Sequence, residues 1–205
     1  MEKKLEAIRA WLGQGSINIF GMPFAGKDTQ GQALADLLEG ELLGGGKILR
    51  GSRIPARAKA IMEAGGLIPI EDYLQIVPPY LSKPEFDGKP LILSSVGRWD
   101  GEQEGVLQAT KISGHPLKAV VLLTVPEGVA RKRHTEAAFM GDREVRADDA
   151  AHLFDKRLDE FRAKTTPVID FYRKHGLVIE IDGTPLAAEV TGAIIGQLER
   201  LATAA

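Results

Sequence analysis

The chain has 205 residues, of which 44% are hydrophobic and 26% charged, the ordinary composition of a globular protein with one sizeable core. Its 26 basic and 28 acidic residues leave a formal net charge of −2, which excludes a general attraction to nucleic acid or to an anionic membrane. Because there is no cysteine, disulfides and thiolate metal sites are excluded. No apolar run approaches the roughly 20 residues of a membrane span. We therefore expect a cytoplasmic monomer with neither nucleic acid nor membrane as a partner.

The chain begins with a predicted amphipathic helix, EKKLEAIRAWL, whose pattern is unlike that of a signal peptide. Leu5, Ile8, Trp11 and Leu12 recur at a spacing that places them on one face of this helix. The sequence GQGS then leads into the first apolar run. We interpret residues 1–15 as a helical extension that packs on the core.

The most informative stretch is residues 17–32, INIFGMPFAGKDTQGQ. A short apolar run suits a buried strand, Gly21 ends it, and from Thr29 onward the apolar residues follow a helical spacing. The spacing G-x-x-x-x-G-K from Gly21 to Lys27 predicts a loop whose backbone N–H groups bind phosphate while the lysine contacts the outer phosphates. The alternative is a tight turn with an exposed lysine. It is less favoured because the expected strand precedes the motif and the expected helix follows it.

Two residues depart from the usual form of this loop. Phe24 stands where many phosphate loops have glycine, so its bulky side chain must lie beside the phosphates or turn outward. Asp28 follows the lysine, where serine or threonine is usual, and its carboxylate repels a triphosphate unless Mg2+ lies between them. We therefore consider two roles for Asp28. It is either a Mg2+ ligand, direct or through water, or a helix N-terminal carboxylate turned away from the site.

The segment after the loop helix is predicted to be helical with interruptions. The stretch GELLGGGKILRG is rich in glycine, and RIPARAKAIMEAGG predicts a helix that is broken at residues 65–66. In LIPIEDYLQIVPPYLSK, Pro69 suits an N-terminal turn, whereas the proline pair at residues 78–79 is expected to kink or end the helix.

Three further apolar runs predict buried parallel strands: PLILSS at residues 90–95, KAVVLLTV at 118–125 and LVIEI at 177–181. Helical segments separate these runs, and a last helix is predicted from about Pro185 to Leu201. This alternation predicts an α/β fold, a doubly wound parallel sheet covered on both faces. In such a fold ligands bind outside the carboxyl ends of the strands, where the phosphate loop also lies.

The sequence HTEAAFMGDREV, between Arg133 and Arg146, has neither a helical nor a strand period, and we interpret residues 134–146 as a lid. Positive charge gathers around it in an otherwise slightly acidic chain, at Arg131, Lys132, Arg133, Arg143, Arg146 and Arg157. Phosphoryl transfer requires several fixed cations and a closure that excludes water. We favour this interpretation over the alternative of a solvated basic face.

These residues resemble the adenylate kinase family. GMPFAGKDTQ is similar to the family's phosphate loop G-x-P-G-x-G-K-G-T-Q, and RADDAAHLFDKRLDEFRAKTTPVIDFY is similar to R-x-D-D followed by K-R-L and T-x-P-L-I-x-Y-Y. AIMEAGGLIP resembles the segment before the monophosphate pocket, and EIDGTPLAAEV resembles the strand, turn and helix that border the adenine. The resemblance covers nearly the whole chain beyond residue 16.

The resemblance implies a single P-loop kinase domain over residues 1–205, with five parallel strands. It implies a helical segment at about 45–82 that binds the nucleoside monophosphate (NMP), and a short lid at about 134–146 that closes on ATP. The implied reaction transfers the γ-phosphoryl of ATP to an NMP, with AMP the first acceptor to test, Mg2+ as the cofactor of ATP, and no zinc. The alternative is a module on the same fold that senses nucleotides without catalysis. A motor or switch triphosphatase is disfavoured, because neither PLILSS nor KAVVLLTV ends in an aspartate for Mg2+.

The resemblance also implies ATP-binding residues, by their position in the motifs. Lys27 corresponds to the lysine that holds the β- and γ-phosphates, and Arg133 to the arginine that stacks on the adenine of ATP. The full implied set is Gly21, Pro23, Ala25, Gly26, Lys27, Asp28, Thr29 and Arg133.

For the acceptor, the resemblance implies that Arg50 and Arg98 contact the phosphate of the monophosphate and that Leu67 and Ile68 flank its base. Gln103 corresponds to the glutamine that reads this base, although it lies one residue further from Arg98 than in the family. Further along the chain, two arginines correspond to the pair that bridges the donor and acceptor phosphates. The implied catalytic residues are Lys27, Arg98, Arg146 and Arg157.

Three features near the site depart from the family pattern or leave alternatives open. The family's D-G-F-P-R is replaced by SSVGR, so Ser94 stands where a carboxylate orients Mg2+ through water, and Asp28 is the candidate to replace that carboxylate. The sequence GGK at residues 45–47 replaces T-G-D, which removes a hydroxyl near the acceptor base. Trp99 either lines the acceptor pocket or makes an aromatic packing contact.

Overall fold

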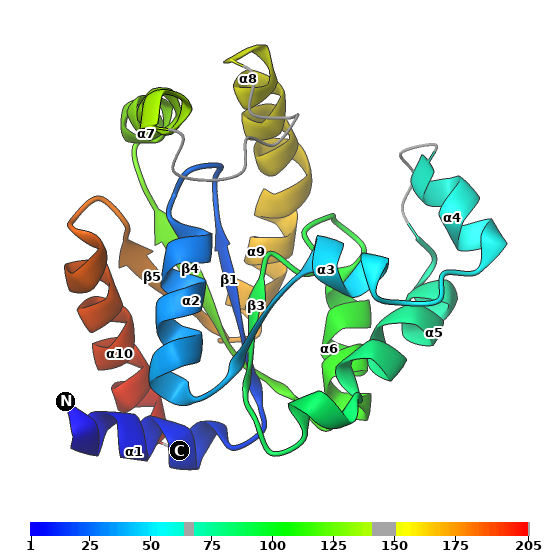
Figure 1. The fold of residues 1–205 in the computed structure, drawn as a ribbon, viewed down its shortest axis with the longest axis horizontal. Coiled ribbons are helices and arrows are strands. Elements are labelled where there is room, and N and C mark those ends of the chain that lie inside the picture. Colours follow the sequence, from blue (N-terminus) through cyan, green and yellow to red (C-terminus); the bar gives the residue numbers. More distant parts are fainter. Residues whose placement is uncertain (64–67, 141–150, 205) are drawn as a thin grey trace.

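The computed structural model describes residues 1–63, 68–140 and 151–204. Five parallel strands form one sheet in the order β2-β3-β1-β4-β5 (Figure 1). The strands are β1 (Ser16–Gly21), β2 (Glu41–Gly44), β3 (Leu91–Ser94), β4 (Leu117–Thr124) and β5 (Val178–Asp182). The predicted α/β fold with a doubly wound five-stranded parallel sheet is therefore confirmed.

The strand β1 lies at the centre of the sheet because its apolar run tolerates burial on both faces. All six of its residues are buried, and the side chains of Ile17, Ile19 and Phe20 have no exposed area. The edge strand β2 is not among the predicted apolar runs. Only Leu43 of its four residues is buried, so the sequence carries no continuous apolar signal there.

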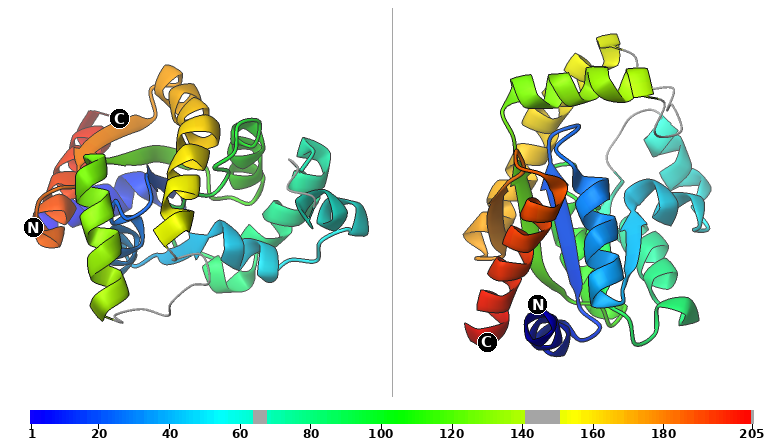
Figure 2. Two further views of the ribbon diagram at one scale, coloured as in Figure 1. Left: turned by 90° about the horizontal axis from the view of Figure 1, so that it is seen from above. Right: turned by 60° about the vertical axis from the view of Figure 1, so that its left-hand side comes forward.

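Helices cover both faces of the sheet (Figures 1 and 2). On one face lie α2 (Lys27–Leu38) and α10 (Ala187–Ala204), and α1 (Glu2–Leu12) packs against α10. The other face is covered by α6 (Gln103–Ile112) and α9 (Thr166–Lys174). None of the helices in the described part of the chain is both long and apolar enough to cross a membrane.

The N-terminal helix α1 joins the main core as its periodicity predicts. Leu5, Ile8 and Leu12 are buried in the same cluster as apolar side chains of α2 and α10. At the surface, the ammonium of Lys4 pairs with a carboxylate oxygen of Glu199 on α10 at 2.6 Å. Burial of the apolar face therefore fixes this helix, since an exposed ion pair contributes little by itself.

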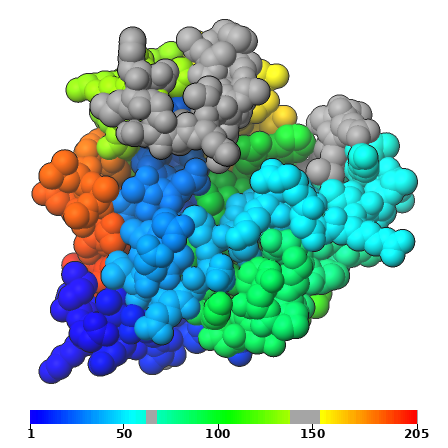
Figure 3. Space-filling model, viewed as in Figure 1, coloured from blue at the N-terminus to red at the C-terminus, as the bar shows by residue number. Residues whose placement is uncertain are grey.

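Beyond β2 the chain forms α3 (Gly45–Arg50) and α4 (Ala56–Glu63), followed by α5 (Ile70–Leu81) and a short 3-10 turn, η1 (Pro84–Phe86). The helix α5 packs on α6 and α3, while α4 projects from the body of the molecule (Figures 1 and 3). This helical segment thus borders the sheet beside β3, on the side away from β5.

The proline pair at residues 78–79 does not end α5, which continues to Leu81. Each proline removes one i→i−4 backbone hydrogen bond in the last turn of the helix. The apolar face of α5 holds this turn in place, because Ile76, Val77, Tyr80 and Leu81 are buried.

The helices α7 (Glu127–Met140) and α8 (Ala151–Glu160) lie at the end of the sheet where the strands finish (Figure 1). A π-helical turn, η2 (Phe161–Thr165), joins α8 to α9. Residues 134–140, for which the sequence shows no clean period, continue α7. The rest of the predicted lid, together with Arg143 and Arg146, lies outside the described residues.

Candidate active site

A cavity of about 1480 Å³ lies at the carboxyl ends of the strands. The phosphate loop after β1 lies at its middle, Arg133 and Gly183 line one end, and Tyr73 and Val77 line the other. Its volume exceeds the roughly 300–1,000 Å³ of a pocket for one small ligand. The cavity is therefore large enough for two ligands that meet over the phosphate loop.

The loop between β1 and α2 has the geometry of a phosphate cradle. Gly26 adopts a left-handed conformation with φ +98°, which turns the chain into α2 at Lys27. The Nζ of Lys27 donates hydrogen bonds to the carbonyl oxygens of Gly21 at 2.8 Å and Met22 at 2.9 Å. Its ammonium therefore lies against the loop, beside the N-terminus of α2.

The structure brings every predicted ATP-binding residue to the wall of this one cavity. The lining includes the residues of the loop and the arginine of α7, namely Gly21, Pro23, Ala25, Gly26, Lys27, Asp28, Thr29 and Arg133.

Phe24 fits into the loop because its ring packs against two helices. Its backbone has φ +63°, and its ring lies 4.8 Å from that of His134 on α7 and 5.9 Å from that of Phe154 on α8, centroid to centroid. The left-handed conformation costs about 1–2 kcal/mol for a residue with a side chain. Burial of apolar ring surface against α7 and α8 offsets this cost.

Arg133 connects the phosphate loop to the loop after β5. Its Nη2 donates to the carbonyl oxygens of Gly183 at 2.8 Å and Thr184 at 3.3 Å, and Nη1 lies 3.5 Å from the carbonyl oxygens of Phe24 and Ala25. The planar guanidinium thus forms part of the cavity wall at the end bordered by β5.

Only some of the predicted cations around the lid reach the cavity. Among the described residues, Arg133 and Arg157 line it, and Lys156 of α8 joins them. By contrast, Arg131 and Lys132 are paired with acidic side chains at the surface. Arg131 and Lys132 therefore fit the alternative interpretation, a basic face exposed to solvent.

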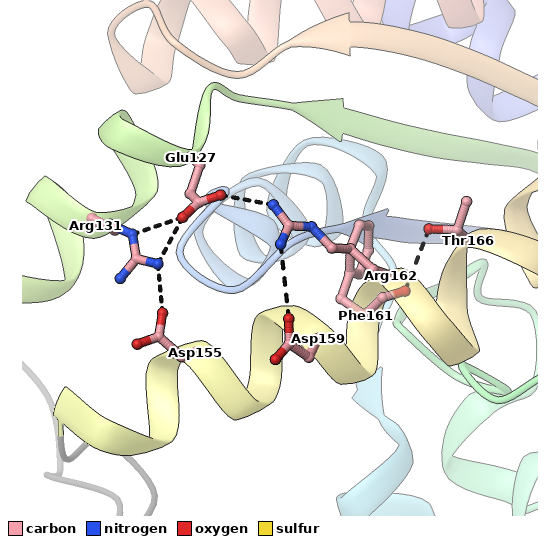
Figure 4. Close-up of polar contacts among 7 residues, drawn as sticks. All are labelled: Glu127, Arg131, Asp155, Asp159, Phe161, Arg162 and Thr166. Carbon is pink, nitrogen blue, oxygen red and sulfur yellow. Dashed lines mark hydrogen bonds and ion pairs between the residues drawn. The ribbon is translucent and has the colours of Figure 1, made fainter.

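The surface network around Glu127 joins α7 to α8 and to the turn η2 that follows it (Figure 4). Arg131 donates to Glu127 and Asp155, while Arg162 donates to the second oxygen of Glu127 at 2.7 Å. Hydrogen bonds from Arg131 and Arg162 hold the pKa of Glu127 below its ordinary value. The network lies beside the cavity and connects the two helices from which Arg133 and Arg157 extend.

Asn18 fixes the loop that carries Arg98. Its buried amide on β1 donates to the carbonyl oxygen of Val96 at 2.8 Å and accepts from the N–H of Val96 at 3.3 Å. Two hydrogen bonds inside the protein hold this loop against the central strand, where unpaired polar groups are costly. The sequence reasoning missed this residue, although a lone polar side chain in the apolar run INIF was an available signal.

Gly97, next to Arg98, makes the same loop sensitive to substitution. It has φ +66°, and a Cβ there would lie 2.2 Å from Cγ2 of Val106. We expect Gly97→Ala to lower the free energy of unfolding by about 2–4 kcal/mol, from backbone strain plus overpacking. Urea denaturation measures the loss. Gly114→Ala is the matched control, because Gly114 has φ +81° and open space around it, so only about 1–2 kcal/mol of strain is expected. Equal losses in the two variants would refute the clash.

At the other end of the cavity, the structure assembles the described part of the predicted acceptor site. Arg50 at the end of α3, Arg98 and Ile68 all line the cavity, whereas Leu67 lies outside the described residues. Trp99 lines this end as well, and the ammonium of Lys164 lies 4.1 Å from its ring centroid. Trp99 therefore lines the cavity and also contacts the ammonium of Lys164.

Gln103 is not among the residues that line the cavity. Its side-chain oxygen accepts the N–H of Gly101 at 2.7 Å, and its nitrogen donates to Asp100 at 3.3 Å. Instead, the neighbouring Glu102 lines the acceptor end. The structure thus places a carboxylate, which the sequence reasoning did not consider, where the family comparison placed an amide.

Asp28 and Ser94 meet at the edge of the cavity. The hydroxyl of Ser94 donates to Oδ1 of Asp28 at 2.9 Å, although 66 positions separate them in the chain. The described residues contain no cluster of three or more acidic or histidine side chains that could hold a metal ion alone. One oriented carboxylate beside a phosphate loop nevertheless fits Mg2+, which binds proteins through one or two carboxylates while phosphates and water complete its shell.

A parallel sheet, a phosphate loop after its central strand and a two-ended cavity lined by cations define a P-loop protein that binds nucleotides. The chain matches the family model for adenylate kinase over residues 19–177. It is 34% identical to an adenylate kinase of Methylorubrum populi over 193 residues, covering 89% of this chain and 95% of the relative. It is 33% identical to one from Agrobacterium fabrum, covering 88% and 95%. The chain therefore belongs to the adenylate kinase family.

Proposed function

We propose that the chain is an ATP-dependent nucleoside monophosphate kinase that transfers the γ-phosphoryl of ATP to AMP and forms two molecules of ADP. The observation that carries this proposal is one cavity of about 1480 Å³ that is lined by the phosphate loop and by residues on both sides of it. Membership of the adenylate kinase family supports the same reaction. No described feature favours the alternative of a catalytically impaired sensor.

The proposed catalysis consists of positioning and charge neutralisation. The acceptor phosphate is already an anion, so the reaction needs no general base. Lys27 neutralises the β- and γ-phosphates of the donor, Arg50 and Arg98 hold the acceptor phosphate, and Arg157 lies between the two ligands. Arg133 borders the donor adenine, and Ile68 flanks the acceptor base. Arg146 and Leu67 complete the proposed set from outside the described residues, and Gln103 stays in the proposed acceptor set although it does not line the cavity.

A coupled assay for ADP tests this proposal. With ATP as donor and a panel of monophosphates as acceptors, we expect diphosphate formation that depends on both nucleotides. A sensor without catalysis would bind the same nucleotides, as seen by calorimetry, and yield no diphosphate. That result would contradict the proposed function and support the alternative.

For the metal, we propose that Asp28 replaces the carboxylate missing at Ser94, with the Ser94 hydroxyl orienting it. Mg2+ bound with ATP neutralises part of the phosphate charge. In this arrangement Lys27 and Asp28, adjacent in the chain, approach the phosphates and their metal from the same helix N-terminus.

We expect Asp28→Ala to raise the Mg2+ concentration needed for half-maximal ATP binding by about 10-fold or more. Binding of metal-free ATP is expected to become tighter, because a carboxylate that repels the triphosphate is lost. Calorimetry of ATP with and without Mg2+ measures both effects. Asp36→Ala, on the exposed face of the same helix, is the control and leaves both values unchanged. An unchanged Mg2+ titration in Asp28→Ala would support the alternative of an N-terminal helix carboxylate.

We further propose that residues 45–82 form the monophosphate-binding segment and that residues 134–146 form the lid of a single domain, with residues 1–15 as its helical extension. One chain supplies both ends of the cavity, which supports action as a monomer on ATP and an NMP. We place the protein in the cytoplasm, with no zinc and with neither nucleic acid nor membrane as a partner. Light scattering after size exclusion tests the oligomeric state.

A further inference from the structure

The acceptor end of the cavity has the form of a slot for a planar base. Ile68, Tyr73 and Val77 supply apolar and aromatic walls on the side of α5, and Trp99 lines the loop after β3. Arg50 and Arg98, which hold the acceptor phosphate in the proposed function, line the same end. The inference below rests on that function, because it concerns which base this slot accepts.

Glu102, at the N-terminus of α6, places an acidic side chain in this slot. Its Oε2 accepts the N–H of Trp99 at 3.2 Å, which fixes the carboxylate at the wall of the cavity. Within the described part of the chain, Oε1 accepts no hydrogen bond. One carboxylate oxygen is therefore held in place while the other is available to a ligand.

A carboxylate only accepts hydrogen bonds, whereas an amide both donates and accepts. Guanine presents two neighbouring donors on its Watson–Crick edge, N1–H and the 2-amino group, and adenine presents one donor, the 6-amino group, beside an acceptor, N1. An ionised Glu102 therefore matches guanine at both positions and adenine at only one. A protonated carboxyl donates and accepts as an amide does, and it matches adenine.

We propose that Glu102 reads the acceptor base and that its carboxylate makes GMP an acceptor alongside AMP. The reaction is unchanged in kind: the terminal phosphoryl of ATP passes to the phosphate of GMP, and ADP and GDP are formed. Two glycines that line the same cavity leave space beside them. A Cβ at Gly44 would meet nothing within 4 Å, and one at Gly45 would meet only the carbonyl oxygen of Ser95, at 4.0 Å.

The protonation state of Glu102 is expected to set the preference of the slot between guanine and adenine. Burial raises the pKa of Glu102, and the N–H of Trp99 and the guanidinium of Arg98 partly oppose that rise. Tyr73 on α5 and Tyr172 on α9 also interact electrostatically with Glu102, and their pKa values are raised by burial and by its charge. Both tyrosines therefore stay neutral over the working range of pH. Raising the pH ionises Glu102 and favours guanine, and lowering it favours adenine.

The test compares kcat/KM for GMP and AMP, with ATP as donor, in the wild type and in Glu102→Gln. We expect the GMP to AMP ratio to fall about 10-fold or more in Glu102→Gln, because the amide is matched to adenine. Glu104→Gln is the matched control, an exposed residue on the same helix, and leaves the ratio unchanged. IMP, which has N1–H but no 2-amino group, is expected to fall between GMP and AMP in the wild type.

The pH dependence of the GMP to AMP ratio tests whether Glu102 reads the base. If Glu102 had only a structural role, this ratio would not change with pH. As the pH is lowered through the raised pKa of Glu102, the wild-type ratio is expected to fall, while that of Glu102→Gln stays flat. The phosphate group titrates alike in both monophosphates, so its contribution cancels in the ratio. Calorimetry of GMP and AMP without ATP gives the same comparison for binding alone.

Three results would overturn the inference. One is a wild type that phosphorylates AMP but neither binds nor phosphorylates GMP, and another is an unchanged ratio in Glu102→Gln. Both leave the proposed function intact. The third is a wild-type GMP to AMP ratio that does not change with pH. This result would contradict the inference even if circular dichroism shows that Glu102→Gln does not fold. If no monophosphate yields diphosphate, the proposed function fails, and the binding ratio of GMP to AMP still tests Glu102.

Discussion

Lys27→Met is expected to reduce kcat/KM by about 10²–10³-fold, because it removes the fixed positive charge beside the transferred phosphoryl. In the structure the ammonium of Lys27 lies over the phosphate loop, bonded to the carbonyl oxygens of Gly21 and Met22. Methionine preserves the length and the apolar stem of the side chain but supplies neither the charge nor the donors. Steady-state ADP formation at saturating Mg2+ and ATP measures the effect.

The control for this variant is Lys111→Met, on the exposed face of α6 and outside the cavity. It makes the same chemical change, and we expect its turnover to match that of the wild type. Circular dichroism establishes that both variants retain the fold. Near-normal turnover of Lys27→Met would refute the assignment of the phosphate loop as the donor site.

Arg157→Met is expected to lower kcat by about 10²-fold or more with a smaller change in KM for ATP. Arg157 extends from α8 into the cavity, and its guanidinium carbon lies 6.0 Å from the ring centroid of Phe24 in the phosphate loop. Its guanidinium therefore lies beside the phosphate loop. An interaction made mainly in the transition state affects kcat rather than ground-state binding.

Arg162→Met is the matched control for Arg157, five positions further along the same helical segment. The guanidinium of Arg162 pairs with Glu127 and Asp159 beside the cavity rather than inside it (Figure 4). Exposed ion pairs contribute about 0–1 kcal/mol to stability, so only a small change in unfolding and in turnover is expected. If Arg162→Met lost as much activity as Arg157→Met, the charge of Arg157 would have no special role in phosphoryl transfer.

The donor half of the site was predictable because its signals are local. The strand before the phosphate loop, the glycines of the turn and the start of α2 follow one another within a few residues, and each constrains its own backbone. The structure places all of the predicted ATP-binding residues on one cavity, including Arg133, which is remote in sequence from the phosphate loop. The edge strand β2 escaped prediction because its four residues are only partly buried.

The acceptor half was less predictable because it depends on orientation. Successive residues of a helix point about 100° apart. The start of α6 therefore decides which of Glu102 and Gln103 lines the cavity, and composition does not reveal that choice. The sequence reasoning chose Gln103, whose side chain the structure holds against Asp100 and Gly101. Glu102 lines the cavity instead.

By itself, the amino-acid sequence determined the class of fold, the position of the phosphate loop and the family, since these follow from apolar periodicity and from residues close together in the chain. Only the tertiary structure decided which distant groups meet. The strands β1 and β3 are parallel neighbours, so their carboxyl ends lie at one edge of the sheet and bring Asp28 to Ser94 and Asn18 to Val96. Contacts of this kind depend on strand order and register, which arise from the packing of the whole core rather than from any local pattern.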